Sequence, residues 1–190
     1  IIDKEDFAFG TSSRSAKMIH GGLRYLQNLQ VKLVKEALHE REHLLKQYPH
    51  LVKPQPFFMP VYKSAFSKIK LGIGLSGYDY LTGGSSMPKH KEISTKEIKE
   101  RFPQLKTDSI KGGFIYYDAK TNDARLTNDV IQDAVDLGAV ALNYFELSEF
   151  HATNNSINEI TCIDKLSGIN YNLKSKVIVI ATGIWTDELM

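Results

Sequence analysis

Cysteine is almost absent from this sequence: Cys162 is the only one in 190 residues. An internal disulfide is therefore excluded, and a lone thiol is typical of a reducing compartment. The sequence also lacks the run of about 18 apolar residues that a membrane-spanning helix needs, and it shows no secretory signal. These absences exclude a membrane-spanning segment, whereas contact with a membrane surface stays open.

An excess of charge of one sign is also missing. Lys and Arg together number 24 and Asp and Glu 22, which gives a net charge of +2. Nucleic-acid binding normally requires a concentrated basic face, so the sequence predicts no nucleic-acid partner. The histidines show no metal-ligand spacing with Cys162, and we predict no metal site; the histidines considered are His39, His43, His50, His90 and His151.

The sequence lacks an initiator methionine, an internal repeat and a low-complexity tract. It opens on Ile1-Ile2-Asp3, as though in mid-strand, and it reaches Met190 without a finishing element. Natural domains tend to end in solvated, flexible segments. We therefore expect both ends to be cuts inside a longer protein.

Apolar residues recur at helical spacing between Leu26 and Tyr48, with Glu and Lys between them. This pattern predicts one amphipathic helix over that range. Four prolines follow, and they predict extended chain through residues 57–59. Residues 82–95 have the composition of a loop, and Ser94 is placed to cap a short helix. The apolar positions of the long helix are Leu26, Leu29, Leu33, Ala37, Leu44 and Tyr48.

The second half alternates between strands and a helix. Residues 114–118 predict an aromatic strand, and Asn122 or Asp123 is placed to cap a helix that Gly138 ends. Further strands are expected at about 139–147 and 157–163, with a turn at 165–168. Residues 177–180 are all apolar without alternation, which predicts a strand buried on both faces of a parallel sheet. The alternation of helices and strands indicates an α/β or α+β fold.

Asp3 follows two isoleucines that resemble the end of a buried strand. In a dinucleotide-binding βαβ unit, an acidic residue at this place bonds a ribose, about 20 residues after a glycine-rich phosphate loop. That loop would precede residue 1. Taken alone, Asp3 is more typical of a surface carboxylate; the strand end before it and the motif after it favour the ribose contact.

Residues 10–26 are the most informative stretch of the chain. Their hydroxyls and the cations Arg14 and Lys17 precede a helix and offer donors to an anion. Gly21-Gly22 would let the backbone approach a flat ligand. The forked guanidinium of Arg24 is suited to bind phosphate, and the Tyr25 hydroxyl offers a second donor. A capped helix, a glycine turn and a solvated arginine explain the same residues equally well.

The motif Thr11-Ser12-Ser13-Arg14-Ser15, running into Lys17-Met18-Ile19-His20-Gly21-Gly22-Leu23-Arg24-Tyr25-Leu26, closely resembles the FAD-dependent glycerol-3-phosphate dehydrogenases and the related α-glycerophosphate oxidases. The resemblance continues through Tyr116-Tyr117-Asp118 and Asp123-Ala124-Arg125-Leu126 to Ala181-Thr182-Gly183-Ile184-Trp185. It implies the two-dinucleotide FAD-binding fold of the glutathione-reductase and D-amino-acid-oxidase kind. Ile184 departs from the proline that the family usually has before Trp185.

The resemblance also implies a role for individual residues. Arg24 and Tyr25 match the family's contacts to the substrate phosphate, and Asp3 would take the FAD ribose. Other phosphate contacts of the family lie beyond Met190, and the catalytic base stays unknown. The FAD contacts implied are Asp3, Thr11, Ser12, Ser15, Lys17, His20, Gly21, Gly22, Leu147, Ala181 and Gly183.

By resemblance, the parent enzyme oxidises sn-glycerol 3-phosphate to dihydroxyacetone phosphate and passes electrons from FAD to quinone. It would be cytoplasmic and peripherally bound to the membrane. The rivals are an oxidase that uses oxygen and a D-amino-acid-oxidase-like flavoprotein; the isolated chain could also be an inactive folded substructure. We expect residues 1–50 in the FAD-binding domain, 51–120 in the substrate domain, and 121–190 returning to the FAD-binding domain.

Overall fold

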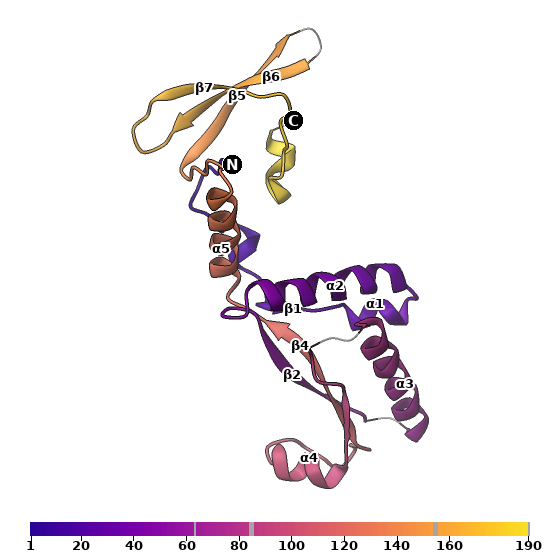
Figure 1. Ribbon diagram of the computed structural model, residues 1–190. Coiled ribbons are helices and arrows are strands. Elements are labelled where there is room, and N and C mark those ends of the chain that lie inside the picture. Colours follow the sequence, from indigo (N-terminus) through magenta and orange to yellow (C-terminus); the bar gives the residue numbers. More distant parts are fainter. Residues whose placement is uncertain (63, 84–85, 154–155, 190) are drawn as a thin grey trace. The chain divides into compact units, whose positions relative to one another are not determined.

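The computed structural model describes residues 1–62, 64–83, 86–153 and 156–189; Ala65 and Thr153 are described by their backbone alone. The chain forms two compact units (Figure 1). The first unit contains residues 1–12 and 127–190, and the second unit contains residues 13–126.

The second unit is built on a four-stranded antiparallel sheet with β4 (Gly113–Lys120) at its centre. Strand β2 (Lys53–Pro60) pairs with β4 along its whole length, from Lys53 opposite Lys120 to Pro60 opposite Gly113. Strands β1 (Met18–Ile19) and β3 (Lys91–Ile93) also pair with β4. The prolines of β2 are tolerated because this strand has a single neighbour and needs fewer N–H donors. The predicted extended chain at 57–59 is confirmed.

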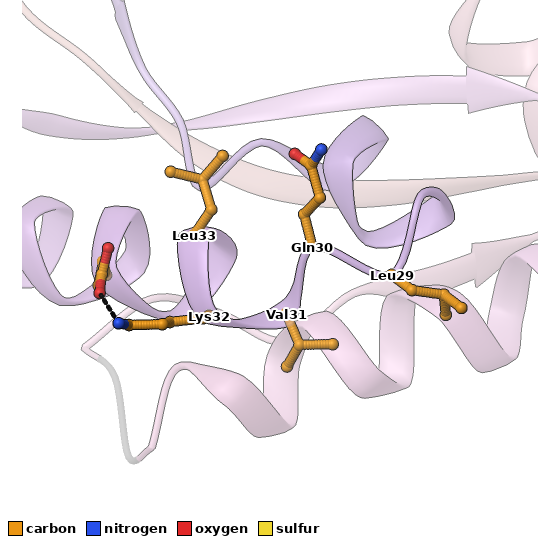
Figure 2. A pocket seen from close by; sticks show the side chains of 6 residues that line it. Leu29, Gln30, Val31, Lys32 and Leu33 are labelled. Atoms are coloured by element: carbon orange, nitrogen blue, oxygen red, sulfur yellow. Dashed lines mark ion pairs between the residues drawn. The ribbon is translucent and has the colours of Figure 1, made fainter.

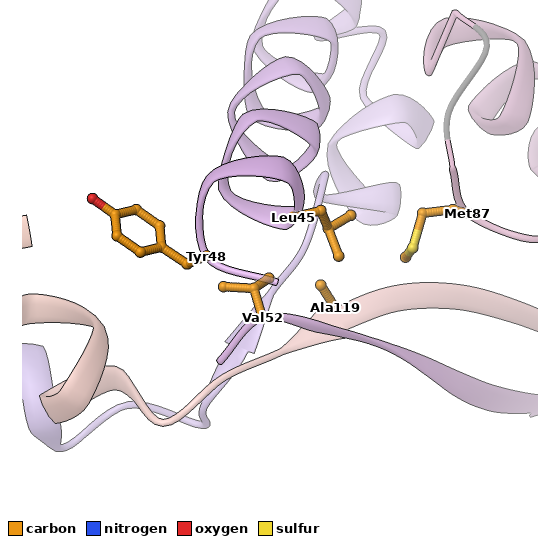
Figure 3. Packing of buried hydrophobic residues seen from close by; sticks show 5 residues of the cluster. All are labelled: Leu45, Tyr48, Val52, Met87 and Ala119. Atoms are coloured by element: carbon orange, nitrogen blue, oxygen red, sulfur yellow. The ribbon is translucent and has the colours of Figure 1, made fainter. Parts of the chain in front are cut away.

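Four helices pack around this sheet: α1 (Leu23–Gln27), α2 (Val31–Gln47), α3 (Ala65–Leu81) and α4 (Thr95–Arg101). The predicted cap of α4 is confirmed, because the Ser94 hydroxyl accepts from the Glu97 N–H and the Glu97 carboxylate accepts from the Ser94 N–H. The end of α2 packs on β4 in a core cluster shown in Figure 3, which contains Leu45, Tyr48, Val52, Met87 and Ala119.

The prediction of one helix from Leu26 to Tyr48 is wrong in its continuity and in part of its buried face, since Leu26, Leu44 and Tyr48 do pack in the core. The helix breaks between α1 and α2, where Leu29 has a left-handed φ of 57°. Leu29 and Leu33 are exposed as a result. The buried residues of α2 follow a different phase after the break; they are Val34, Leu38, Arg41, Glu42 and Leu45.

Helix α5 (Asp123–Asp136) begins and ends as predicted. The Asn122 side chain accepts a hydrogen bond from the Arg125 N–H at 3.2 Å, so Asn122 supplies the cap. Gly138 ends the helix with a left-handed φ of 96°, and its N–H donates to the Val135 carbonyl.

The first unit carries a three-stranded antiparallel sheet of β5 (Phe145–Thr153), β6 (Ser156–Asp164) and β7 (Asn170–Lys174). Its core contains Phe145, Ile160 and Cys162. The predicted turn before β7 is confirmed, because the Gly168 N–H donates to the Asp164 carbonyl with φ at 73°. The unit also includes two short 3₁₀ helices, η1 (Thr11–Ser13), whose last residue belongs to the second unit, and η2 (Gly183–Glu188).

Two strand predictions in the first unit need correction. The strand expected at 139–147 begins only at Phe145, because Tyr144 has a left-handed φ of 52°. Residues 177–180 form no strand, and Val177 and Val179 are exposed. A strand buried on both faces needs a neighbour on each side, and no described strand pairs with these residues.

The start of the chain forms an isolated bridge in place of the end of a buried strand expected at Ile1-Ile2, and Ile1 is exposed. Ile2 forms a parallel bridge with Leu142, and the Asp3 N–H donates to the Leu142 carbonyl at 3.0 Å. Within the described ranges, no helix is both long and apolar enough to cross a membrane. The assignment of FAD-binding and substrate-binding roles to residues 1–50, 51–120 and 121–190 stays a prediction.

Candidate functional site

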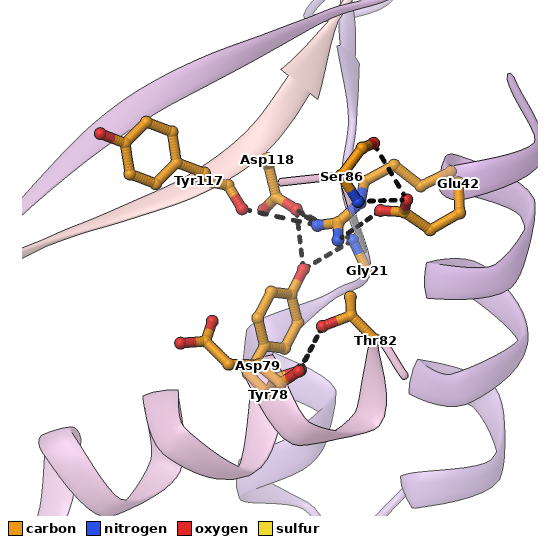
Figure 4. A network of polar contacts seen from close by, with 9 residues as sticks. Gly21, Glu42, Tyr78, Asp79, Thr82, Ser86, Tyr117 and Asp118 are labelled. Carbon is orange, nitrogen blue, oxygen red and sulfur yellow. Dashed lines mark hydrogen bonds and ion pairs between the residues drawn. The ribbon is translucent and has the colours of Figure 1, made fainter. Parts of the chain in front are cut away.

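Gly21 lies in a buried polar network of the second unit (Figure 4). Its N–H donates to the Tyr78 hydroxyl at 2.8 Å and reaches Asp118 Oδ1 at 3.4 Å. The same Asp118 oxygen accepts from the Tyr78 hydroxyl at 2.8 Å and from Arg41 Nη1 at 2.6 Å. Helices α2 and α3 and strand β4 thus converge on one backbone N–H that follows β1.

The network is closed from water. Arg41 is 1% exposed and Asp118 and Tyr78 are each 2% exposed. Burial, and then the negative charge of Asp118, hold the pKa of the Tyr78 hydroxyl well above its ordinary value. Tyr78 therefore stays protonated and donates to Asp118 while it accepts from Gly21.

Arg41 also connects the network to the loop that follows α3. Its Nη2 lies 3.4 Å from Glu42 Oε1, and Glu42 Oε2 accepts from the Ser86 N–H at 3.3 Å. Arg41 Nε has no hydrogen-bond partner among the described residues. A cavity of about 80 Å³ lies beside Arg41, Tyr78 and Tyr117.

Gly21 and Gly22 are glycines for two different reasons. A Cβ at Gly21 would lie 2.2 Å from Leu38 Cδ2 and 2.6 Å from the Tyr78 hydroxyl, so the packing leaves no room. Gly22 has a left-handed φ of 71°, and a Cβ there would also meet the Tyr25 ring at 2.4 Å. The chain therefore enters α1 through a turn that only glycines permit.

Helix α1 presents Arg24 and Tyr25 outward. Leu23 and Leu26 of the same helix pack against the core clusters around Val34, Leu38 and Tyr78, so they fix which face of α1 is turned inward. Arg24 is exposed, and Tyr25 is 45% exposed with its ring over Gly22. The two residues predicted to contact the substrate phosphate are accessible and adjacent.

Ser15 and Lys17 are held by one carboxylate, Asp123 at the start of α5. The Ser15 hydroxyl donates to Asp123 Oδ2 at 2.7 Å, and Lys17 Nζ lies 2.5 Å from Asp123 Oδ1. Hydrogen bonds from Lys17 and Ser15 hold the pKa of the Asp123 carboxyl far below its usual range. Lys17 has a left-handed φ of 59°, and its carbonyl accepts from the Thr121 N–H.

His20 is exposed and directly precedes Gly21. The remaining predicted FAD contacts lie in the first unit. Thr11 and Ser12 are exposed in η1. The Asp3 carboxylate accepts from the Glu5 N–H at 3.0 Å, directly after the parallel bridge at Ile2.

Leu147, Ala181 and Gly183 complete the predicted set. Leu147 is half-buried against the core of the three-stranded sheet. Ala181 is exposed, and Gly183 has a left-handed φ of 56° with open space where a Cβ would stand. Gly10 lies so close to the Trp185 ring that a Cβ would stand 2.7 Å from it, so η2 packs on the segment before Thr11.

A surface hollow lies at the turn between α1 and α2 (Figure 2). None of the predicted site residues lines it. Its walls are largely exposed side chains of the helix break, and we assign it no role. The residues lining it are Leu29, Gln30, Val31, Lys32, Leu33 and Glu36.

Sequence reasoning missed the partners of the motif. Arg41 occupies a core position of α2, between the buried Leu38 and Leu45, where the helical period demands an apolar residue. A cation at such a position signals a buried pair. Asp118 interrupts an aromatic strand in the same way, whereas nothing in the local pattern marks Tyr78. Within the described chain, no cluster of His, Cys, Asp or Glu could hold a metal.

Comparison with known proteins supports the motif. Aerobic glycerol-3-phosphate dehydrogenase of Staphylococcus epidermidis is 39% identical over 191 residues, which cover 100% of this chain and 34% of that protein. The crystal structure of glycerol-3-phosphate dehydrogenase from Bacillus halodurans, complexed with FAD, has a TM-score of 0.72 at 28% identity and covers 99% of this chain and 30% of its own. The resemblance read from residues 11–26 is confirmed.

A more distant structure shares the fold alone. L-α-glycerophosphate oxidase from Mycoplasma pneumoniae has a TM-score of 0.59 at 11% identity and covers 85% of this chain and 41% of its own. The predicted mixed fold of the FAD-binding kind is confirmed by these neighbours. This chain spans about a third of the length of the curated relatives it matches.

One family profile, described as FAD dependent oxidoreductase, matches residues 1–190 without interruption. The match includes both compact units and every residue that the motif singled out. The chain belongs to the family of FAD-dependent oxidoreductases.

Proposed function

We propose that this chain is part of an FAD-dependent enzyme that oxidises sn-glycerol 3-phosphate to dihydroxyacetone phosphate. The observation that carries the proposal is the 39% identity with an aerobic glycerol-3-phosphate dehydrogenase over the whole chain. Fold alone would not select this substrate, since one fold hosts many functions. The substrate follows from the relative's name and from Arg24 and Tyr25, which match the motif and are accessible.

The polar groups of the chain, both donors and acceptors, fit FAD in their chemistry. The exposed Thr11 and Ser12 hydroxyls suit the polar parts of the cofactor, and the Asp3 carboxylate suits the hydroxyls of a ribose. The Gly21-Gly22 turn is itself buried, with Leu38 and Tyr78 against Gly21 and the Tyr25 ring against Gly22, so its contact with the flavin stays a prediction from the motif. When bound, FAD supplies the acceptor for the hydride that leaves C2 of the substrate.

The chain's own part in this reaction is to bind and orient the substrate. Arg24 can form two parallel hydrogen bonds to the phosphate dianion, and the Tyr25 hydroxyl can add a third. Because Leu23 and Leu26 anchor α1 in the core, the phosphate is held relative to Gly21. Such orientation lowers the barrier by removing freedom before the reaction.

Replacing Arg24 by Lys in the full-length protein tests this assignment. Lys keeps the charge but loses the bidentate fork, so binding of glycerol 3-phosphate should weaken by roughly 1–3 kcal/mol. Steady-state kinetics with glycerol 3-phosphate and with unphosphorylated glycerol measure the effect. The loss should be much smaller with glycerol, which has no phosphate to pair.

The control is Arg101→Lys on α4, an exposed arginine beside Glu97 at 3.9 Å. This variant should behave as the wild type with both substrates. An equal loss for both substrates in Arg24→Lys would place Arg24 in a structural role and contradict the proposal.

The electron acceptor that we propose is a quinone. The support is the word dehydrogenase in the relative's name, as opposed to the oxidase, which is similar only in fold. Parallel assays of quinone reduction and hydrogen peroxide formation separate the two. Peroxide formation at the rate of substrate oxidation would favour the oxidase.

We further propose that the protein is cytoplasmic and binds a membrane surface through α3. Three large apolar residues on one face of this helix, Phe66, Ile69 and Ile73, are between 61% and 75% exposed, and Tyr80 extends that face. An exposed apolar helix face is typical of interfacial binding. Co-sedimentation of the full-length protein with anionic vesicles should fall for Ile69→Asp with Ile73→Asp, and unchanged sedimentation would contradict the proposal.

A further inference from the structure

Burying the charges of the network beneath Gly21 is unfavourable, and apolar side chains would fill the same part of the core. Arg41 and Asp118 are almost fully buried, and a buried ion pair is often no more stabilising than apolar side chains of the same volume. The role of the network must therefore lie in the groups that it holds in place. Its shared acceptors, the Tyr78 hydroxyl and Asp118 Oδ1, both face the Gly21 N–H.

The Gly21 N–H is a group that the fold has to satisfy. It is buried, and a buried N–H that loses its acceptor destabilises the folded state. The acceptors come from distant parts of the chain, Tyr78 on α3 and Asp118 on β4. Arg41 on α2 fixes the Asp118 carboxylate at 2.6 Å and lies over the Tyr78 ring at 5.8 Å.

The position of Gly21 is fixed from the other side as well. Leu38 and the Tyr78 hydroxyl leave no space for a Cβ, so the backbone lies directly against them. Gly22 then turns the chain into α1 with a left-handed φ, and Arg24 and Tyr25 follow within one helical turn. A displacement of Gly21 would therefore carry over to both residues of the phosphate contact.

We propose that Arg41, Tyr78 and Asp118 are positioning residues that hold the Gly21–Gly22 turn and thereby orient Arg24 and Tyr25 toward the substrate. The identity of the ligand that Arg24 and Tyr25 bind rests on the proposed function, whereas the role of the three residues in holding Gly21 does not. The three residues touch neither substrate nor cofactor and act through the backbone of Gly21.

Tyr78→Phe in the full-length, FAD-loaded protein is the mildest test. It removes one hydroxyl and keeps the ring, so the Gly21 N–H is left with the longer contact to Asp118. Amide hydrogen exchange in the peptide that contains Gly21 and Gly22 should accelerate about tenfold, as expected for one lost buried hydrogen bond. The matched control is Tyr117→Phe, the neighbour of Asp118 whose ring points away from the network in Figure 4.

The second measurement is steady-state kinetics. Rates are expressed per bound FAD and are recorded below the melting temperatures of both variants. KM for glycerol 3-phosphate should rise about tenfold in Tyr78→Phe with kcat changed much less, because phosphate binding contributes equally before and in the transition state. KM for glycerol should change little. Tyr117→Phe should match the wild type in exchange and in both kinetic constants.

Three results separate the possibilities. Unchanged exchange at Gly21 in Tyr78→Phe overturns the positioning role, and so does faster exchange with unchanged KM for glycerol 3-phosphate in an active enzyme. If Tyr78→Phe does not fold, Arg41→Lys, which keeps a positive charge beside Asp118 but loses the planar guanidinium that fixes its carboxylate, replaces it in both arms. A wild-type protein that does not oxidise glycerol 3-phosphate refutes the proposed function instead, while the exchange arm still decides whether Gly21 is held.

Discussion

The two ion pairs that hold the candidate site have nearly the same length in opposite surroundings. Arg41 Nη1 lies 2.6 Å from Asp118 Oδ1, and Lys17 Nζ lies 2.5 Å from Asp123 Oδ1. The side chains of the first pair are at most 3% exposed, whereas the Lys17 side chain is 52% exposed. Burial therefore decides what each pair contributes, because water and salt screen the exposed pair.

Because of this difference in burial, the two pairs anchor the motif in two different ways. The buried pair cannot exchange its partners for water, so it fixes Gly21 in one place. The exposed pair orders Ser15 and Lys17 but leaves the ammonium group accessible to a ligand. The stretch from Ser15 to Gly21 thus has a rigid end at Gly21 and an adjustable part at Ser15–Lys17.

The largest effect is expected from Asp118→Ala. Removal of this carboxylate leaves the Arg41 charge buried without its main partner and the Gly21 N–H without one of its acceptors. Breaking a buried pair typically costs about 3–5 kcal/mol. Urea unfolding of the full-length protein measures the loss, and the exposed Asp108→Ala serves as control. A loss below that of an ordinary surface substitution would show that the pair has no special role.

A smaller effect is expected from Gly21→Ala, which tests packing without removing a charge. The new methyl group would overlap Leu38 and the Tyr78 hydroxyl, and such overpacking costs about 1–3 kcal/mol. Gly74→Ala in α3 is the control, because nothing lies within 4 Å of its Cβ position. That change should stabilise the protein by about 0.5–1 kcal/mol. Equal effects of the two variants in urea unfolding would contradict the close packing at Gly21.

The smallest effect is expected from Asp123→Asn, and it should depend on pH and salt. The Asp123 pKa lies below its ordinary value of about 3.9 in the folded state, so the carboxylate stabilises the fold above that pH. The contribution is lost as the pH falls through the lower, folded pKa. The difference in melting temperature between wild type and variant should therefore be present at pH 7 and shrink toward pH 2–3.

High salt provides the companion measurement for this pair. At about 1 M salt the screening length falls to about 3 Å, so the difference between wild type and Asp123→Asn should narrow. The loss caused by Asp118→Ala should stay nearly unchanged, because salt does not reach the buried pair. A buried pair that responds to salt as strongly as the exposed one would remove the contrast on which this account depends.

Local signals were enough to predict several elements of the fold. The Ser94 capping box, the proline-rich β2 and the cap of α5 each depend on residues next to one another in the chain. Helix α3 was not predicted, because Gly72, Gly74 and Gly77 lower its helix propensity. Its exposed apolar face also obscures the usual amphipathic period.

The motif led to the candidate residues but not to what holds them. Gly21 was predicted from its neighbours, whereas its acceptors Tyr78 and Asp118 lie 57 and 97 residues further along the chain. The pairing of Lys17 with Asp123 spans 106 residues. Such contacts depend on how helices and strands pack, and a single sequence carries no direct sign of them.

The helix break at Leu29 shows the same limit on a smaller scale. Leu29 has an apolar side chain at the expected helical spacing, yet it adopts a left-handed backbone and is 84% exposed. The packing of α1 and α2 against Tyr78 overrides the local preference. The apolar period therefore located the helical region and the core contacts at its two ends, but it was wrong at Leu29 and Leu33 beside the break.

The most direct test of the central claim is anaerobic addition of glycerol 3-phosphate to the full-length, FAD-loaded protein. We expect the visible absorbance of the oxidised flavin to bleach within the mixing time of ordinary assays, with one dihydroxyacetone phosphate formed per flavin reduced. Glycerol and a D-amino acid, added separately, should leave the absorbance unchanged or bleach it far more slowly. Bleaching by the amino acid but not by glycerol 3-phosphate would contradict the assignment of Arg24 and Tyr25 to a phosphate.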